Sequence, residues 1–133
     1  LWVVMGAAAI SANAGTSLIE SETQVPFLAA QKHFIDGVTL LVWSWATWWI
    51  PLLFLFGVWK HLVRKLSYAY EPSIWSMVFP LGMYAVVSER LGQIAEFPPM
   101  IWIAHIMIWL AILAWLFSAI GLALQLNKTL RQS

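Results

Sequence analysis

The sequence predicts an all-α integral membrane protein, and three observations support this prediction. Of the 133 residues, 62% are apolar and 10% are charged, whereas an average soluble domain carries about 25% charged residues. Four apolar segments have about the length needed to cross a hydrocarbon core of about 30 Å as helices. The charged residues gather between these segments. The chain has no cysteine, which excludes disulfides and thiolate metal sites, and its net charge of +1 predicts no nucleic-acid partner.

The four predicted helices form one transmembrane region and cover residues 1–19, 37–59, 73–90 and 97–126. The first contains no charge and many small residues. The second is bounded by Asp36 and Lys60, and the third is short and closes with Glu89 and Arg90. The fourth is long enough to tilt in the bilayer or to extend beyond it.

The distribution of basic residues predicts the orientation of the chain. Basic residues accumulate on the cytoplasmic side of membrane proteins. Here they lie in the second loop and in the C-terminal tail, at Lys60, Arg64, Lys65, Lys128 and Arg131, whereas the first and third loops are mainly acidic. We therefore expect a multi-pass protein of the cell membrane (the inner membrane in a bacterium) with a cytoplasmic C-terminus.

Side-chain size predicts which helices lie inside. Gly6, Ala9, Asn13 and Ser17 recur every three or four residues on one side of the first helix, and small residues let helices approach closely. The second and fourth helices carry eight of the ten tryptophans. This order suggests two hairpins, each with an inner helix followed by an outer one. A plain four-helix bundle with the same alternation is the alternative.

Titratable residues inside the predicted helices are scarce, so an enzyme is not expected. His105 is the only acid or base away from the helix ends, and no zinc-type spacing occurs. A haem between His33 and His105 is a weaker interpretation, because His33 precedes its helix and His61 lies outside the spans. A packed or water-facing histidine is preferred, and we expect no metal and no cofactor.

The remaining polar residues within the helices are uncharged, and most can hydrogen-bond to the backbone of their own helix. This expectation covers Ser11, Thr16, Ser17, Ser44, Thr47, Ser76 and Ser118. Asn13 is the exception, because an amide needs several partners; it lines a pore or joins two helices. The tryptophan cluster WSWATWWIP (residues 43–51) is interpreted as packing of an outer helix, with a kink at Pro51.

The stretch VFPLG (residues 78–82) breaks the third helix. Pro80 removes one helical N–H, and Gly82 loosens the backbone. If the resulting bend faces a water-filled path, the ring of Phe79 can block that path, because hydrophobic constrictions exclude water. The alternative is a phenylalanine packed in a kinked structural helix.

YEPSIWSMVFPLGMYAVVSERL (residues 70–91) closely resembles the penultimate helix of the tellurite-resistance/dicarboxylate transporter family. This family is also called the voltage-dependent anion channel family and includes the slow anion channels of plant guard cells. WSWATWWIPLLFLFGVWKH and LWVVMGAAAISANAGTSLI resemble the two preceding helices. The resemblance covers essentially the whole chain and corresponds to the last four of ten helices.

The resemblance implies a pore and a gate. Members of the family arrange five helical hairpins around a central pore, which is lined by the first helix of each hairpin, and commonly form trimers. The matching positions make Phe79 the pore gate. The implied hinge and pore-lining residues are Ser76, Pro80, Gly82, Met83, Gly6 and Asn13.

We therefore predict an anion channel or transporter whose partners are membrane lipids and small anions. The candidate solutes are chloride, nitrate, sulfite, a C4-dicarboxylate and a tellurite-type oxyanion. Because the chain begins with Leu1 inside a helix, we interpret it as a C-terminal portion that needs further helices, in a homotrimer, to close the pore. The alternatives are a haem-binding membrane anchor and a non-conducting structural membrane subunit.

Overall fold

The computed structural model of the chain describes residues 2–21, 25–59 and 75–132, and every regular element in these ranges is a helix. The helices are α1 (Trp2–Glu20), α2 (Pro26–Ala30), α3 (Lys32–Val58), α4 (Trp75–Ile94) and α5 (Pro98–Gln132). The predicted all-α architecture is confirmed. The basic loop with Lys60, Arg64 and Lys65, together with His61 and the expected helix start at residue 73, lies outside the described residues.

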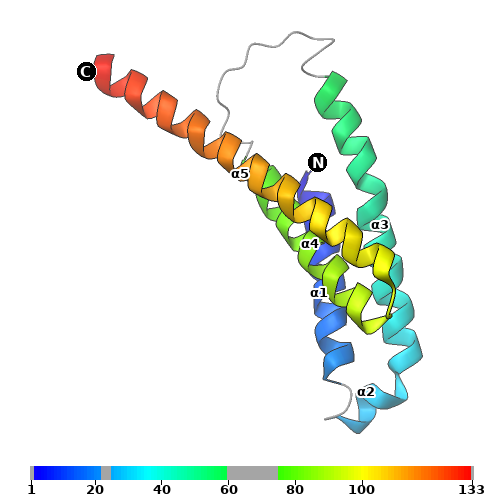
Figure 1. The fold of residues 1–133 in the computed structure, drawn as a ribbon. Coiled ribbons are helices and arrows are strands. Elements are labelled where there is room, and N and C mark those ends of the chain that lie inside the picture. The colour runs from blue at the N-terminus through cyan, green and yellow to red at the C-terminus, as the bar shows by residue number, and fades with distance from the viewer. Residues whose placement is uncertain (1, 22–24, 60–74, 133) are drawn as a thin grey trace.

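The four long helices pair as two hairpins (Figure 1). α1 packs along α3 and α4, and α4 also packs along α5. α1 and α4 thus lie between α3 and α5; we call α1 and α4 the inner helices, and α3 and α5 the outer helices. This arrangement agrees with the order predicted from side-chain size. The C-terminal part of α5 extends away from the other helices (Figure 1).

Three helices, α1, α3 and α5, are long and apolar enough to cross a membrane. α4 is not among them, because residues such as Ser76, Glu89 and Arg90 lower its hydropathy. Eight of its twenty residues are buried, compared with three of twenty-seven in α3. The protein itself covers much of α4, so this helix needs less apolar surface than a helix surrounded by lipid.

α4 is α-helical without interruption from Trp75 to Ile94, and the bend at Pro80 and Gly82 stays a prediction. α3 likewise continues through Pro51. An interior proline removes one hydrogen bond, and neighbouring helices make this tolerable in membrane proteins. Pro80 is buried against α1, which provides such a neighbour. α4 also continues four residues beyond the predicted end at residue 90.

The turn between α4 and α5 is a Schellman motif. The N–H of Phe97 donates to the carbonyl of Gly92 (2.9 Å), and the N–H of Glu96 donates to that of Gln93 (3.3 Å). Glu96 has a φ of 50°, in the left-handed region where glycine is favoured at this position. Pro98 then begins α5, where its missing N–H costs nothing.

Each of the three extensive contacts between long helices, α1–α3, α1–α4 and α4–α5, contains a glycine. A Cβ at Gly6 would lie 2.9 Å from Cγ of Pro80 in the α1–α4 contact, and a Cβ at Gly92 would lie 2.7 Å from Cγ1 of Ile101 in the α4–α5 contact. A Cβ at Gly15 would overlap the side chain of Thr39 on α3. Small residues therefore allow the helices to approach closely at these three contacts.

A hydrogen-bonded cluster connects α3 to α4. Nε1 of Trp43 donates to Oγ of Ser88 (2.8 Å), and the hydroxyls of Thr47 and Tyr84 are 2.7 Å apart. The rings of Trp43 and Tyr84 stack with centroids 6.0 Å apart. Tyr84 and Ser88 are fully buried, so part of the tryptophan cluster packs the helices together, as predicted.

Candidate functional site

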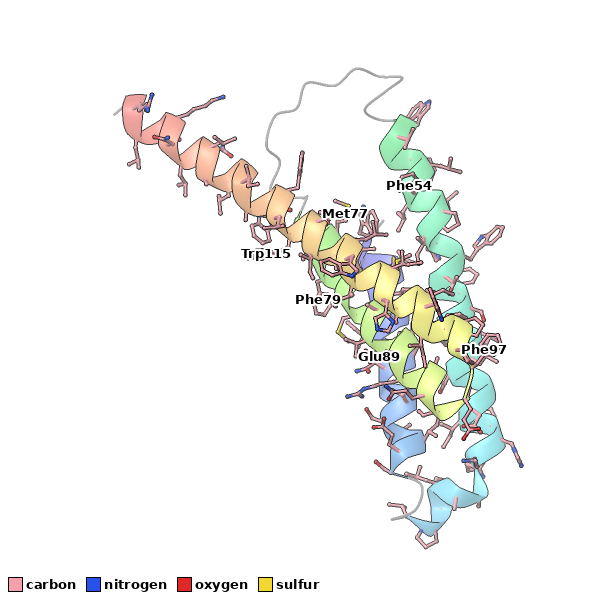
Figure 2. All side chains as sticks on the ribbon, in the orientation of Figure 1. Phe54, Met77, Phe79, Glu89, Phe97 and Trp115 are labelled. Atoms are coloured by element: carbon pink, nitrogen blue, oxygen red, sulfur yellow. The ribbon has the colours of Figure 1, made fainter. Side chains whose placement is uncertain are left out.

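The exposed surface of the outer helices consists mainly of large apolar side chains. It includes five tryptophans, which are Trp45, Trp48, Trp102, Trp109 and Trp115. Figure 2 shows Phe54 and Trp115 on these helices. Such a surface suits the hydrocarbon of a bilayer, where aromatic and aliphatic side chains need no polar partners.

The exposed surface of the inner helices differs in composition. Along α4 the exposed residues are Ser76, Phe79, Val86, Glu89, Gln93 and Ile94, and the seven-residue spacing of Phe79, Val86 and Gln93 places these three on one side of the helix. Phe79 is 57% exposed and is the only aromatic side chain exposed on the described residues of α1 and α4. It projects on the side of α4 away from α3 (Figure 2). We call the side of α4 that carries Phe79, Val86 and Gln93, together with the adjoining Asn13 and Ser17 of α1, the inner face.

Arg90 lies on the same side of α4 as Phe79, because eleven residues correspond to three helical turns. The two residues are separated by about 16 Å along the helix axis. Arg90 is half-buried, and its Nη1 donates to Oδ1 of Asn13 (3.3 Å) and to Oγ of Ser17 (3.4 Å). The inner face therefore joins an aromatic position to a cationic and polar one.

The structure places the six predicted hinge and lining residues differently. Gly6 and Pro80 are buried against each other in the contact of the inner helices. Ser76 is exposed, and Gly82 and Met83 are half-buried. A Cβ at Gly82 would meet no atom within 4 Å. Asn13 is half-buried and accepts its hydrogen bond from the neighbouring inner helix.

The expected hydrogen bonds of hydroxyl groups to their own helix are confirmed for six residues. These are Ser11, Thr16, Ser17, Ser44, Thr47 and Ser118. Asn13 differs from these residues, because its side-chain oxygen accepts a hydrogen bond from Arg90 of α4. Arg90 was missed as a site residue, because its position beside Glu89 suggested a helix end. Its spacing of eleven residues from Phe79 was the signal that places it on the same side of the helix.

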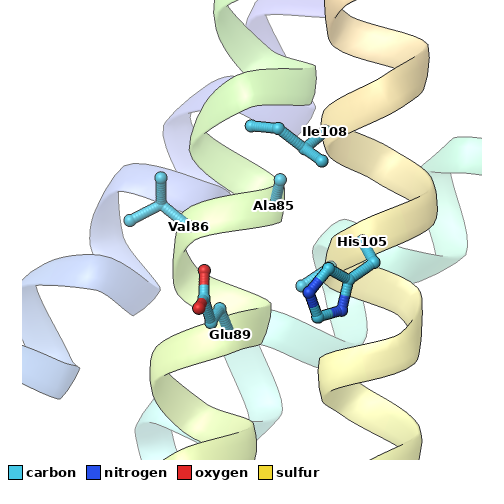
Figure 3. Close-up of a pocket in the computed structure, with 6 residues that line it drawn as sticks. Ala85, Val86, Glu89, His105 and Ile108 are labelled. Atoms are coloured by element: carbon cyan, nitrogen blue, oxygen red, sulfur yellow. The ribbon is translucent and has the colours of Figure 1, made fainter.

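A second polar feature lies between α4 and α5. Glu89 and His105 face a groove of about 70 Å³ that Ala85, Val86 and Ile108 also line (Figure 3). Nδ1 of His105 lies 2.8 Å from the carbonyl oxygen of Ile101, and Nε2 of Gln93 donates to Oε1 of Glu89 at 3.5 Å. His105 is exposed, so it is not packed in the described part of the structure.

Comparison with known proteins provides independent information. The family model described as voltage-dependent anion channel matches residues 1–123. An uncharacterized membrane protein of Mycobacterium tuberculosis is 34% identical over 99% of this chain, which spans 66% of that protein's length. An uncharacterized transporter of Methanocaldococcus jannaschii is 26% identical over 78% of this chain, and the match covers 29% of that transporter. No solved structure gives a significant match.

Proposed function

Since the chain belongs to the voltage-dependent anion channel family, we propose that it supplies part of the wall of an anion-conducting pathway and its gate. The inner face of α1 and α4 is the wall, and the ring of Phe79 is the gate. The observation that carries this proposal is the contrast between the two kinds of exposed surface. The outer helices expose tryptophans and many aliphatic side chains, whereas the described residues of the inner helices expose no tryptophan. There the exposed Phe79 and aliphatic residues such as Val3 and Ile10 lie among polar groups, the half-buried Arg90 and the exposed Glu89.

This contrast supports water rather than lipid at the inner face. Arginine is costly in hydrocarbon, and ionisable residues in membrane proteins usually face protein or a water-filled cavity. Phe79 shares its side of α4 with Arg90, so both side chains border the same space. Large apolar rings in a narrow aqueous path block conduction by excluding water.

The hinge role is reassigned within this proposal. Pro80 packs against Gly6 and holds α4 close to α1 beside the gate. Gly82 and Met83 follow Phe79 on the next turn, and both are half-buried. Gating then requires rotation of the Phe79 side chain, with Gly82 leaving space beside it and Met83 and Ser76 lining the path.

The rest of the pathway comes from other membrane segments. The inner face is a single wall, and the chain spans 66% of the length of its mycobacterial relative. We propose that further helices of a longer protein close the path, in a trimer with one pore in each subunit, in the cell membrane with a cytoplasmic C-terminus. A fluorescent protein fused to the C-terminus should therefore fluoresce, whereas alkaline phosphatase fused there should be inactive.

Substitution of Phe79 by alanine tests the gate. In liposomes that contain the complete protein, Phe79→Ala should raise anion flux severalfold, because the ring no longer excludes water. Phe54→Ala is the matched control, since Phe54 is 68% exposed on the outer helix α3. Equal anion flux through the wild type, Phe79→Ala and Phe54→Ala would contradict the assignment of Phe79 as the gate. A non-conducting structural subunit would give no specific anion flux in any of these proteins.

A further inference from the structure

Arg90 is held by two neutral side chains of the neighbouring helix. Both hydrogen bonds come from Nη1, to Oδ1 of Asn13 and to Oγ of Ser17. At 3.3 Å and 3.4 Å, they are longer than the roughly 2.7–2.9 Å of a charge-assisted pair with a carboxylate. The two contacts orient the guanidinium along the α1–α4 contact, and neither partner carries a charge that would neutralise it.

The carboxylate nearest in sequence does not pair with this cation. Glu89 precedes Arg90 on the helix, so its side chain leaves α4 about 100° away. It lies beside the α5 groove near His105 and accepts a hydrogen bond from Gln93 (Figure 3). Over the described ranges 2–21, 25–59 and 75–132, Arg90 has no partner besides Asn13 and Ser17.

The geometry leaves one edge of the guanidinium available. A guanidinium has five N–H donors in a planar fork. Because Nη1 makes both recorded hydrogen bonds, the parallel N–H groups of Nε and Nη2 remain without a partner in the described part of the chain. Two parallel donors match two oxygens on one centre, as in a carboxylate or nitrate, better than they match a spherical halide.

We propose that Arg90, positioned by Asn13 and Ser17, binds oxyanions at the inner face, three helical turns from the Phe79 gate. This proposal rests on the proposed function, because it assigns a selective binding site to the same pathway. The bound anion accepts from Nε and Nη2, and Asn13 and Ser17 act as positioning residues. The site favours planar oxyanions over chloride.

The test uses the complete protein in liposomes, with formate, nitrate and chloride as probes. Arg90→Lys keeps the charge but loses the fork, whereas Arg90→Gln loses both. We expect Arg90→Gln to raise the half-saturating formate concentration about tenfold, which corresponds to the loss of one charged hydrogen-bonded contact. Arg90→Lys should lose the preference for formate and nitrate over chloride. Lys128→Gln removes an exposed cation from the end of α5 and should change neither quantity.

A second variant separates anion binding from a structural role. Asn13→Asp preserves the shape of the side chain but places a carboxylate against Arg90, so the cation becomes paired. If Arg90 is an anion site, this variant should keep or raise the melting temperature and still lose formate affinity. Wild-type formate affinity in both Asn13→Asp and Arg90→Gln would overturn the proposal.

A binding measurement distinguishes this proposal from the proposed function. Formate should raise the melting temperature of the detergent-solubilised wild type but not that of Arg90→Gln. This result without anion flux in liposomes supports the site and contradicts the channel. Flux with wild-type selectivity in both Arg90 variants supports the channel and contradicts the site.

Discussion

Gly6 of α1 and Pro80 of α4 pack so closely that a Cβ at position 6 would lie 2.9 Å from the proline Cγ. Pro80 directly follows the exposed Phe79 on α4, so this contact lies beside the phenylalanine. Pro80 therefore packs against α1. The sequence by itself predicts only a bend at this proline and does not reveal the contact. The absence of a side chain at position 6 is what lets the proline ring fit against α1.

Enlarging Gly6 should separate the inner helices. Gly6→Val inserts atoms into an occupied contact, and overpacking of this kind costs about 1–3 kcal/mol. The melting temperature of the detergent-solubilised protein should fall by several degrees. Gly37→Ala is the control, because a Cβ there would meet nothing within 4 Å. A wild-type melting temperature for Gly6→Val would show that the α1–α4 contact is not tight.

Gly92 should be even less tolerant. A Cβ at this position would lie 3.1 Å from the backbone nitrogen of Ile101 as well as 2.7 Å from its Cγ1, and backbone moves less readily than a side-chain tip. We expect Gly92→Ala to lower the melting temperature by several degrees and to open the α4–α5 turn to added protease. Unchanged protease resistance would contradict this interpretation of the contact.

Replacing Glu96 by glycine should stabilise the α4–α5 turn. Glu96 adopts a left-handed φ of 50°, which costs an L-residue about 1 kcal/mol relative to glycine. Glu96→Gly should therefore raise the melting temperature by a few degrees, and Glu96→Ala should not. If Glu96→Gly and Glu96→Ala have the same melting temperature, the loss of the carboxylate and not the backbone conformation explains any change from the wild type.

The hydrogen bond between Trp43 and Ser88 should contribute measurably to the packing of α3 on α4. Ser88→Ala leaves the indole N–H without its acceptor, whereas Trp43→Phe with Ser88→Ala removes both partners. A double-mutant cycle should give a coupling of about 0.6 kcal/mol, with an upper limit near 1.7 kcal/mol. A coupling of zero in denaturant unfolding would show that the 2.8 Å contact adds nothing to stability.

Much of this architecture could be predicted from local sequence. Gly6, Asn13 and Ser17 of α1 contact α4, as the small residues on this side of the helix indicate. The hydroxyl groups bond to their own helix because their acceptors lie three or four residues away in the same segment. Helix type and the inner and outer order depend on composition and spacing, which the sequence shows directly.

The contacts between helices could not be predicted in the same way. Their register depends on how two segments slide and cross, and no residue encodes this alone. The position of Arg90 beside Glu89 suggests a helix end, but α4 continues to Ile94, and the packing of α4 on α1 places the arginine against Asn13. The missing interruption at Pro80 has the same cause, because the packing against Gly6 becomes visible only when both helices are present.

Chemical labelling can decide whether the inner face is wet. The chain has no cysteine, so a single introduced thiol reports on one position once any cysteine elsewhere in the complete protein is replaced. Val86→Cys on the inner face and Ile112→Cys on the outer helix α5 are matched, because the native side chains are 39% and 40% exposed. An anionic methanethiosulfonate requires water to reach its target, so it should modify Val86→Cys and leave Ile112→Cys unmodified.

Modification of Val86→Cys should also reduce anion flux, since the added group narrows the path between Phe79 and Arg90. Equal protection of both thiols would place the inner face in lipid and remove the basis for the pathway.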